Sequence, residues 1–157
     1  MNEIQRTTVF ASGEGGYPQI RIPSIVKAKN GDLLAFAEGR AFHKDQAEND
    51  VIMKKSKDGG QTWSSMKVLV DAGKDALNNP QAVVLRESGK IILFYQLYPY
   101  PSYNKGLVPG YEDPMKKVWW FGKFPKLIRR IPTRVVKAYY IESIDNGDSW
   151  SEPVDIT

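Results

Sequence analysis

Apolar runs separated by glycine turns predict short β-strands along most of the chain. Residues 23–38 read PSIVKAKNGDLLAFAE, which is an apolar run, a tight turn at Asn30-Gly31 and a second apolar run. Residues 80–96, PQAVVLRESGKIILFYQ, repeat this arrangement. Gly and Asn accept the positive φ that tight hairpins require. A helical period of useful length is absent from the sequence, so the pattern predicts an all-β fold.

An eight-residue box occurs once in each half of the chain. Residues 56–63 (SKDGGQTW) and 143–150 (SIDNGDSW) share the pattern S-x-D-x-G-x-[ST]-W. Its Asp can accept backbone N–H groups, its Gly supplies positive φ, and its Trp is a large apolar anchor. A calcium-binding EF-hand is excluded, because the twelfth residue counted from Asp145 is Ile156 and not Glu. We interpret the box as a structural element of the fold.

Each half of the chain therefore predicts four antiparallel strands joined by hairpins. Four-stranded units repeated along a chain are the blades of a β-propeller, in which each blade packs one face on the next. Blade one is predicted at about 18–72 and blade two at about 79–157. The expected strands are 20–28, 32–39, 50–56 and 63–70 in blade one, and 80–86, 90–97, 135–143 and 150–156 in blade two.

The second unit carries an insert between its second and third strands, at about residues 98–133. Gly31 and Asp58 are 27 positions apart, whereas Gly89 and Asp145 are 56 positions apart. The Pro and Gly content of the 29 extra residues predicts a long loop. Propellers close with about four to eight blades. Two blades are thus expected to be the N-terminal part of a longer protein, inactive alone and able to self-associate through open blade faces.

Composition excludes several classes of site and partner. The chain has no Cys and one His, His43, so thiol chemistry, multi-histidine metal sites and most Ser-His-Asp arrangements are excluded. An apolar run of the roughly 20 residues that a membrane span needs is absent, and no signal peptide is visible. Eight of the 22 Lys and Arg residues lie in 115–137, which leaves 14 against 18 acidic residues elsewhere. That distribution argues against a nucleic-acid partner.

The predicted strand order gathers polar residues at one end of the blades. The start of the first strand, the end of the second and the loop that follows it share that end, whereas the boxes lie at the other. The insert belongs to the first end, where its basic, aromatic part admits three readings: a flap over a site, a docking surface, or solvated charge. The residues expected there are Arg21, Arg40, Asp45 and Asn79.

The ordered set of Arg21-Ile22-Pro23, the LLAFAEGR strand ending in Arg40, Asp45, and two boxes resembles the sialidase (neuraminidase) family. The resemblance covers nearly the whole chain outside the insert. It implies a six-bladed β-propeller that removes terminal sialic acid from glycans and needs no cofactor or metal. Members are often secreted or periplasmic, and the compartment of this chain is left open.

The resemblance also implies roles for single residues. Arg21 matches one of three arginines that grip the sugar carboxylate, which suits a guanidinium's parallel donors. Arg40 matches an arginine that holds polar substituents of the ring. Asp45 stands where the family keeps its general acid/base. Asn79 and Asp50 are further substrate-binding candidates. The family's Tyr nucleophile, its partner Glu and the other two arginines come from later blades.

Other readings of these residues stay open on the sequence alone. Glu38-x-Arg40 also fits a surface ion pair. Asp45 competes with Glu48 and Asp50 for the acid role and is favoured by its spacing from Arg40. Asp50 also fits a residue that only orients its neighbours, and Asn79 also fits a turn before Pro80.

Two rival functions remain beside the exo-α-sialidase prediction. A non-catalytic, carbohydrate-binding propeller would bind glycans without hydrolysis. Another glycosidase or lyase with the same boxes would act on a ligand that need not carry a carboxylate.

Overall fold

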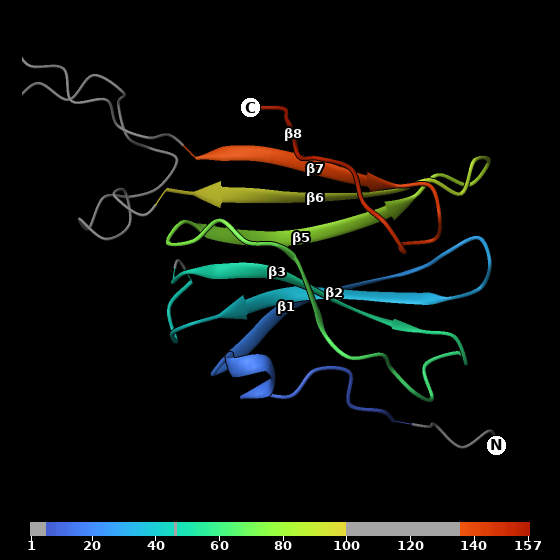
Figure 1. The fold of residues 1–157 in the computed structure, drawn as a ribbon, viewed down its shortest axis with the longest axis horizontal. Coiled ribbons are helices and arrows are strands. Elements are labelled where there is room, and N and C mark those ends of the chain that lie inside the picture. Colours follow the sequence, from blue (N-terminus) through green and yellow to red (C-terminus); the bar gives the residue numbers. More distant parts are fainter. Residues whose placement is uncertain (1–5, 46, 100–135) are drawn as a thin grey trace, which may run out of the picture.

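Two four-stranded antiparallel sheets make up the computed structural model, which describes residues 6–45, 47–99 and 136–157 (Figure 1). The expected all-β class is confirmed. A short 3-10 helix, η1 (Glu14–Gly16), precedes the first strand. The first sheet contains β1 (Gln19–Lys27), β2 (Leu33–Arg40), β3 (Asn49–Ser56) and β4 (Lys67–Val70), and the second contains β5 (Ala76–Val84), β6 (Ile91–Tyr98), β7 (Lys137–Ser143) and β8 (Val154–Asp155). Apart from Tyr98 and Pro99, the predicted insert lies outside the described residues.

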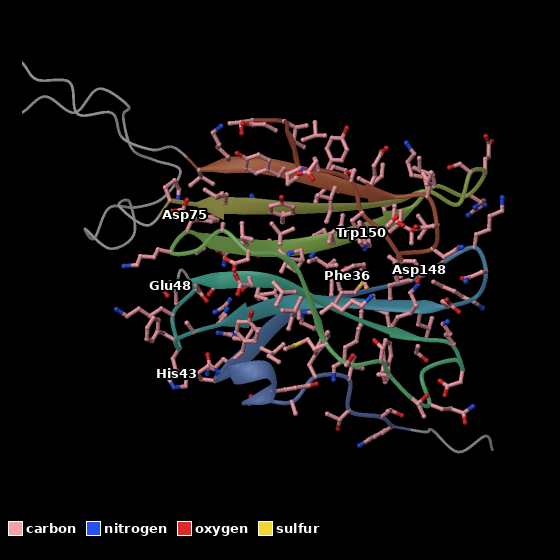
Figure 2. The ribbon with its side chains drawn as sticks, in the orientation of Figure 1. Phe36, His43, Glu48, Asp75, Asp148 and Trp150 are labelled. Carbon is pink, nitrogen blue, oxygen red and sulfur yellow. The ribbon has the colours of Figure 1, made fainter. Side chains whose placement is uncertain are left out.

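The two sheets lie face to face, with one apolar core between them (Figure 1). Because side chains alternate across a strand, every second residue of β2 and β3 faces this core. The ring of Phe36 is fully buried and meets Trp150, the Trp of the second box, edge to face at 5.8 Å (Figure 2). The other buried core side chains include Leu34, Val51 and Met53 of the first sheet and Leu77, Ile91, Leu93, Tyr95 and Ile141 of the second.

The repeat is visible in the register of the two sheets. Ser24 pairs with Phe36 in the first sheet, and Gln81 pairs with Phe94 in the second. Phe94 thus occupies the position that corresponds to Phe36, yet it is 37% exposed. The first sheet buries its Phe under the second box, whereas the equivalent face of the second sheet is open to solvent.

The outer strands are shorter than the sequence predicts, because serine hydroxyls replace part of the ladder. The hydroxyl of Ser64 accepts a hydrogen bond from the Lys55 N–H at 3.1 Å, where a strand would use a backbone carbonyl. Ser151 accepts from the Glu142 N–H in the same way at 3.0 Å. Regular pairing therefore begins only at Lys67 in β4 and at Val154 in β8, after both box tryptophans.

The two boxes fold alike around their aspartates. Asp58 accepts hydrogen bonds from the hydroxyls of Thr62 and Ser56 and from the Thr62 N–H. Asp145 has the corresponding contacts with Ser149 and Ser143. Hydrogen bonds from Thr62 and Ser56 lower the pKa of Asp58 to about 2. Each box carboxylate is occupied in closing its own turn, as a structural element requires.

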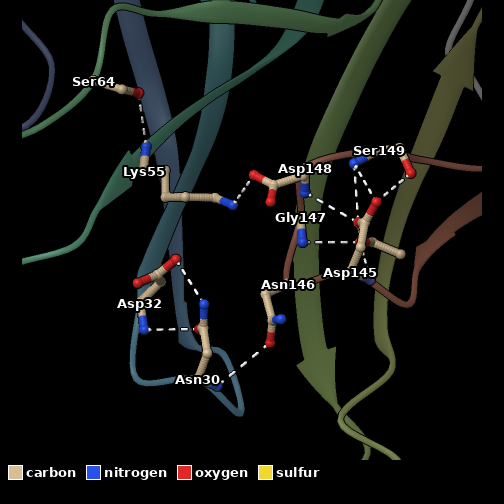
Figure 3. Close-up of polar contacts among 10 residues, drawn as sticks. Asn30, Asp32, Lys55, Ser64, Asp145, Asn146, Gly147, Asp148 and Ser149 are labelled. Atoms are coloured by element: carbon tan, nitrogen blue, oxygen red, sulfur yellow. Dashed lines mark hydrogen bonds and ion pairs between the residues drawn. The ribbon is translucent and has the colours of Figure 1, made fainter.

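The second box also ties the two sheets together at its end of the molecule (Figure 3). Lys55 of β3 donates to the Asp148 carboxylate at 2.5 Å. The backbone N–H of Asn30, in the β1–β2 turn, donates to the side-chain oxygen of Asn146 at 3.4 Å. These contacts fix the sheets at the box end and leave the opposite end for other side chains.

The innermost strand of each sheet carries the same irregularity. The register shifts between Arg21 and Ser24 in β1, and between Asn78 and Gln81 in β5. Ile22 and Asn79, each followed by proline, have φ of 54° and 55°. A β-branched residue such as Ile22 rarely adopts positive φ, so this backbone is strained. The sequence predicts that this strand begins at residue 80. β5 begins instead at Ala76, because pairing with β6 continues on both sides of the register shift.

Candidate functional site

Charged side chains gather at the end of the molecule opposite the boxes. This end holds the start of β1, the end of β2 and the loop that joins β2 to β3. In Figure 2 the labels of His43 and Glu48 mark the loop, and Asp148 lies toward the box end. His43 is exposed. The β1–β2 hairpin turns at the box end, so the first residues of β1 and the last of β2 must meet here.

Three residues singled out from the sequence converge at this end. The Arg40 Nη1 atom lies 2.8 Å from the Asp45 Oδ1 atom and also donates to the Lys44 carbonyl at 3.2 Å. Arg21 reaches the same Asp45 oxygen from β1, with its Nη1 atom at 3.8 Å. One carboxylate thus lies between two guanidinium groups that come from different strands.

Arg40 is held from below by a buried ion pair. Its Nε atom donates to the Glu38 Oε2 atom at 2.7 Å, and its Nη2 atom lies 2.5 Å from the same oxygen. The side chains are 1% and 0% exposed, so the surface alternative for E-x-R is wrong. Residues two apart on a strand share a face, which is why this spacing brings the two groups together.

The Glu38 carboxylate also receives donors from the second sheet. Its Oε1 atom accepts the Asn79 backbone N–H at 2.7 Å and the Asn78 side-chain amide at 3.3 Å. The exposed Asn79 side chain donates instead to Gln96 at 3.0 Å. Asn78, which the sequence analysis missed, is therefore the buried amide on the Arg40–Glu38 pair. Aligning Arg21-Ile22-Pro23 with Asn78-Asn79-Pro80 gives the signal that could have found it.

Asp45 is exposed at its side chain and held at its main chain. The carboxylate is 70% exposed. The backbone carbonyl accepts the side-chain amides of Asn49 at 2.6 Å and Asn78 at 2.7 Å. Asn49, like Asn78, was missed by the sequence analysis. Its only sequence signal was its place beside Asp50 at the start of a predicted strand.

The two guanidinium groups set the protonation of Asp45. The hydrogen bond from Arg40 and its charge, with a smaller contribution from Arg21, lower the pKa of the Asp45 carboxyl. Burial opposes the charge of Arg40, but hydrogen bonds to Asp45 and Glu38 outweigh burial and raise the pKa of the guanidinium. In the free protein near neutral pH, both groups are therefore ionised.

Arg21 lies at the edge of a hollow of about 270 Å³. Its side chain is 53% exposed, so its donors are open to an incoming anion. Ile20, Pro23 and Ala37 supply apolar walls, and Thr8, Val9 and Phe10 complete the lining. Arg40 and Asp45 do not line this hollow, because its walls Ile20 and Ala37 lie on the face of β2 opposite Arg40, where Ile20 pairs with Gly39.

The structure does not bring Asp50 to this cluster. Asp50 pairs with Gly39, and cross-strand partners share a face. It therefore lies on the opposite face of the sheet from Arg40. There its Oδ2 atom accepts the Tyr17 hydroxyl at 2.6 Å. Burial raises the pKa of Asp50, and the Tyr17 hydrogen bond opposes that rise.

Tyr17 also covers Gly39 on that face. A Cβ atom at Gly39 would lie 2.9 Å from the Tyr17 ring, so only glycine lets the ring lie flat against β2. The Tyr17–Asp50 pair therefore supports the strand ends behind Arg40. Glu48, the third acidic candidate, is half-buried with a φ of 52°.

The part of the chain that the structure describes contains no group of three or more His, Cys, Asp or Glu side chains placed to hold a metal ion. Among the same residues no helix is long and apolar enough to cross a membrane.

Comparison with known proteins relates the chain to one family. The model of the BNR repeat-like domain matches residues 31–157. The chain is similar to an exo-alpha-sialidase of Arthroderma benhamiae, with 31% identity over 94% of this chain and 35% of that protein. It is also similar to a sialidase of Micromonospora viridifaciens, with 36% identity over 89% of this chain and 20% of that protein. The chain spans about a third or less of these relatives.

Solved structures show the same likeness in the fold. The NanB sialidase from Streptococcus pneumoniae superposes with a TM-score of 0.72 and 13% identity, over 96% of this chain and 38% of that one. The Hadza microbial sialidase Hz136 gives 0.66 and 20%, over 92% of this chain and 27% of that one. At these identities the likeness is to the fold alone.

Proposed function

Because the chain belongs to the sialidase family with a BNR repeat-like domain, we propose that it forms the first two blades of a six-bladed propeller that acts as an exo-α-sialidase. The substrate would be a glycan with a terminal sialic acid, hydrolysed with retention. One observation carries the proposal: Arg21, Arg40 and Asp45 meet around one carboxylate oxygen at an exposed end of the molecule.

Each of the three residues has a role that its surroundings support. Arg21 is half-exposed, and its ion-pair partner Asp45 is exposed as well, so the Arg21 guanidinium can bind the sugar carboxylate. Arg40, which Glu38 fixes in place, holds polar substituents of the ring and the Asp45 side chain. Asp45 serves as general acid. The exposed Asn79 reaches the sugar from the second blade, whereas Asp50 acts behind the site through Tyr17.

Asp45 must gain a proton to act as an acid, although its pKa is lowered in the free protein. Substrate binding supplies two effects that oppose this lowering of the pKa. A carboxylate bound at Arg21, whose guanidinium lies 3.8 Å from Asp45, offsets that group's charge. The sugar ring also excludes water from the exposed carboxyl. Both effects raise the pKa of Asp45 in the complex, as general acids require.

The chain of 157 residues alone is expected to be inactive, because the Tyr nucleophile that the family resemblance implies is not matched in it. We propose that its open second sheet, where Phe94 is exposed, mediates self-association of this chain in isolation. Activity therefore has to be measured on the full-length protein.

A panel of fluorogenic glycosides tests the proposal. The full-length protein should release fluorophore from an α-sialoside, and uncharged α- and β-hexosides should serve as matched controls that it leaves intact. Hydrolysis of the uncharged glycosides alone would favour another glycosidase. Binding of the sialoside without release would favour a carbohydrate-binding propeller, a reading that the ionised Asp45 of the free protein also fits.

A further inference from the structure

Two buried amides from different sheets meet at the main chain of Asp45. Asn49 at the start of β3 and Asn78 in β5 each donate from Nδ2 to the Asp45 carbonyl, at 2.6 and 2.7 Å. Asn49 is fully buried and Asn78 nearly so. The residue that they hold carries its own side chain out into solvent, so the loop is fixed from beneath while the carboxylate stays accessible.

The orientation of both amides follows from their partner. A carbonyl oxygen only accepts hydrogen bonds, so each amide must turn its NH₂ group toward Asp45. This leaves the Oδ1 atoms of Asn49 and Asn78 buried without a partner among the described residues. Buried acceptors without partners are unfavourable and rare in folded proteins. Two of them beside one carbonyl indicate that these amides are present for their donors.

Asn78 also closes a ring of contacts with the site. Its amide donates to Glu38 at 3.3 Å as well as to the Asp45 carbonyl. Glu38 binds Arg40, and Arg40 binds the Asp45 carboxylate. The main chain and the side chain of Asp45 are thus both connected to the buried Arg40–Glu38 ion pair. A shift of the loop would break at least one member of this ring.

We propose that Asn49 and Asn78 are positioning residues that hold the Asp45 acid in register with Arg40, so that the second blade controls the acid of the first. This inference rests on the proposed sialidase function. An error of about 1 Å in the position of a reacting group can cost about 100-fold in rate. The amides are therefore expected to act on turnover and not on the binding of the sugar carboxylate.

Kinetics of Asn78→Ala and Asn49→Ala in the full-length protein test the proposal. An alkyl sialoside needs its leaving oxygen protonated more than an aryl sialoside does. Each variant should lower kcat on the alkyl substrate about 10- to 100-fold, lower it far less on the aryl substrate, and leave KM nearly unchanged. Asn30→Ala, an amide removed at the box end, is the matched control and should leave both rates unchanged.

A second variant guards against loss of folding. Asn78→Asp keeps the size of the side chain and donates to a carbonyl only when its carboxyl is protonated. Its kcat should therefore recover toward that of the native protein as the pH falls. Unchanged kcat in a folded variant, or equal losses on alkyl and aryl substrates, would overturn the proposal.

An activity-independent readout separates this inference from the proposed function. In ¹³C NMR titrations, Asn78→Ala should move the pKa of Asp45 up toward its ordinary value, because the freed loop loses its contact with Arg40; Asn30→Ala should not. If the native protein failed to hydrolyse sialosides but Asn78→Ala still showed this shift, the positioning role would stand and only the proposed function would fall. An unchanged pKa of Asp45 in Asn78→Ala would overturn the positioning role.

Discussion

Replacing Arg40 by methionine should lower the free energy of unfolding by about 3–5 kcal/mol, because it leaves the buried Glu38 charge without its partner. Glu38 is 0% exposed and, among the described residues, would keep the Asn78 and Asn79 donors. Urea unfolding of the native and variant proteins measures the difference. The loss belongs to the stranded carboxylate, so it should depend on the charge of residue 38.

Two controls isolate that cause. The double variant Glu38→Gln with Arg40→Met removes both charges and should recover a large part of the lost stability. Arg21→Met removes the exposed guanidinium 3.8 Å from Asp45 and should cost less than about 1 kcal/mol, as exposed ion pairs do. Equal losses for Arg21→Met and Arg40→Met would show that the E-x-R pair is not the buried anchor of the site.

Asp45→Ala should reduce turnover of an alkyl sialoside by the full-length protein about 10²- to 10⁴-fold, the usual contribution of a general acid. Turnover of an activated aryl sialoside should fall much less, because its leaving oxygen needs little protonation. The measurement is kcat on both substrates. Stability should change little, since the Asp45 side chain is exposed and alanine keeps the carbonyl that Asn49 and Asn78 bind.

Glu48→Ala is the matched control, since it removes a carboxylate from the same loop. It should retain turnover on both substrates. Native turnover of the alkyl sialoside by Asp45→Ala, or a loss confined to Glu48→Ala, would remove Asp45 from the acid role.

Much of the fold could be predicted because its signals are local. Glycine turns and apolar runs set the inner strands to within a few residues, and the repeated box fixed the number of units. The outer strands were predicted too long, because the Ser64 and Ser151 hydroxyls take the place of ladder acceptors. A hydroxyl that substitutes for a carbonyl leaves no mark in the hydrophobic pattern.

The residues of the candidate site could likewise be predicted only where local signals were enough to place them. Chain order alone placed Arg21, Arg40 and Asp45 at one end, because hairpins return the chain to that end. Asp50 was harder to place, since which face of a strand it occupies depends on a register that only the coordinates show.

Burial was the other quantity that the sequence did not contain. Glu38-x-Arg40 reads alike as a surface pair or a buried one, and the second sheet decides which by covering it. The Asn78 contact needs a β5 register shift as well as the approach of two sheets. Interactions between distant segments are therefore where the sequence-based account of this site ends.

The proposed sialidase activity depends on a carboxylate of the substrate meeting Arg21 beside Asp45. The most direct test compares kcat/KM of the full-length protein for an α-sialoside and for its methyl ester, which has lost only that charge. We expect the ester to react at least about 100-fold more slowly, since charged, bidentate contacts with guanidinium are the stronger ones. Arg21→Met should reduce this difference but not abolish it, because the two arginines expected from later blades would still meet the carboxylate. Equal rates for the acid and the ester would contradict the account.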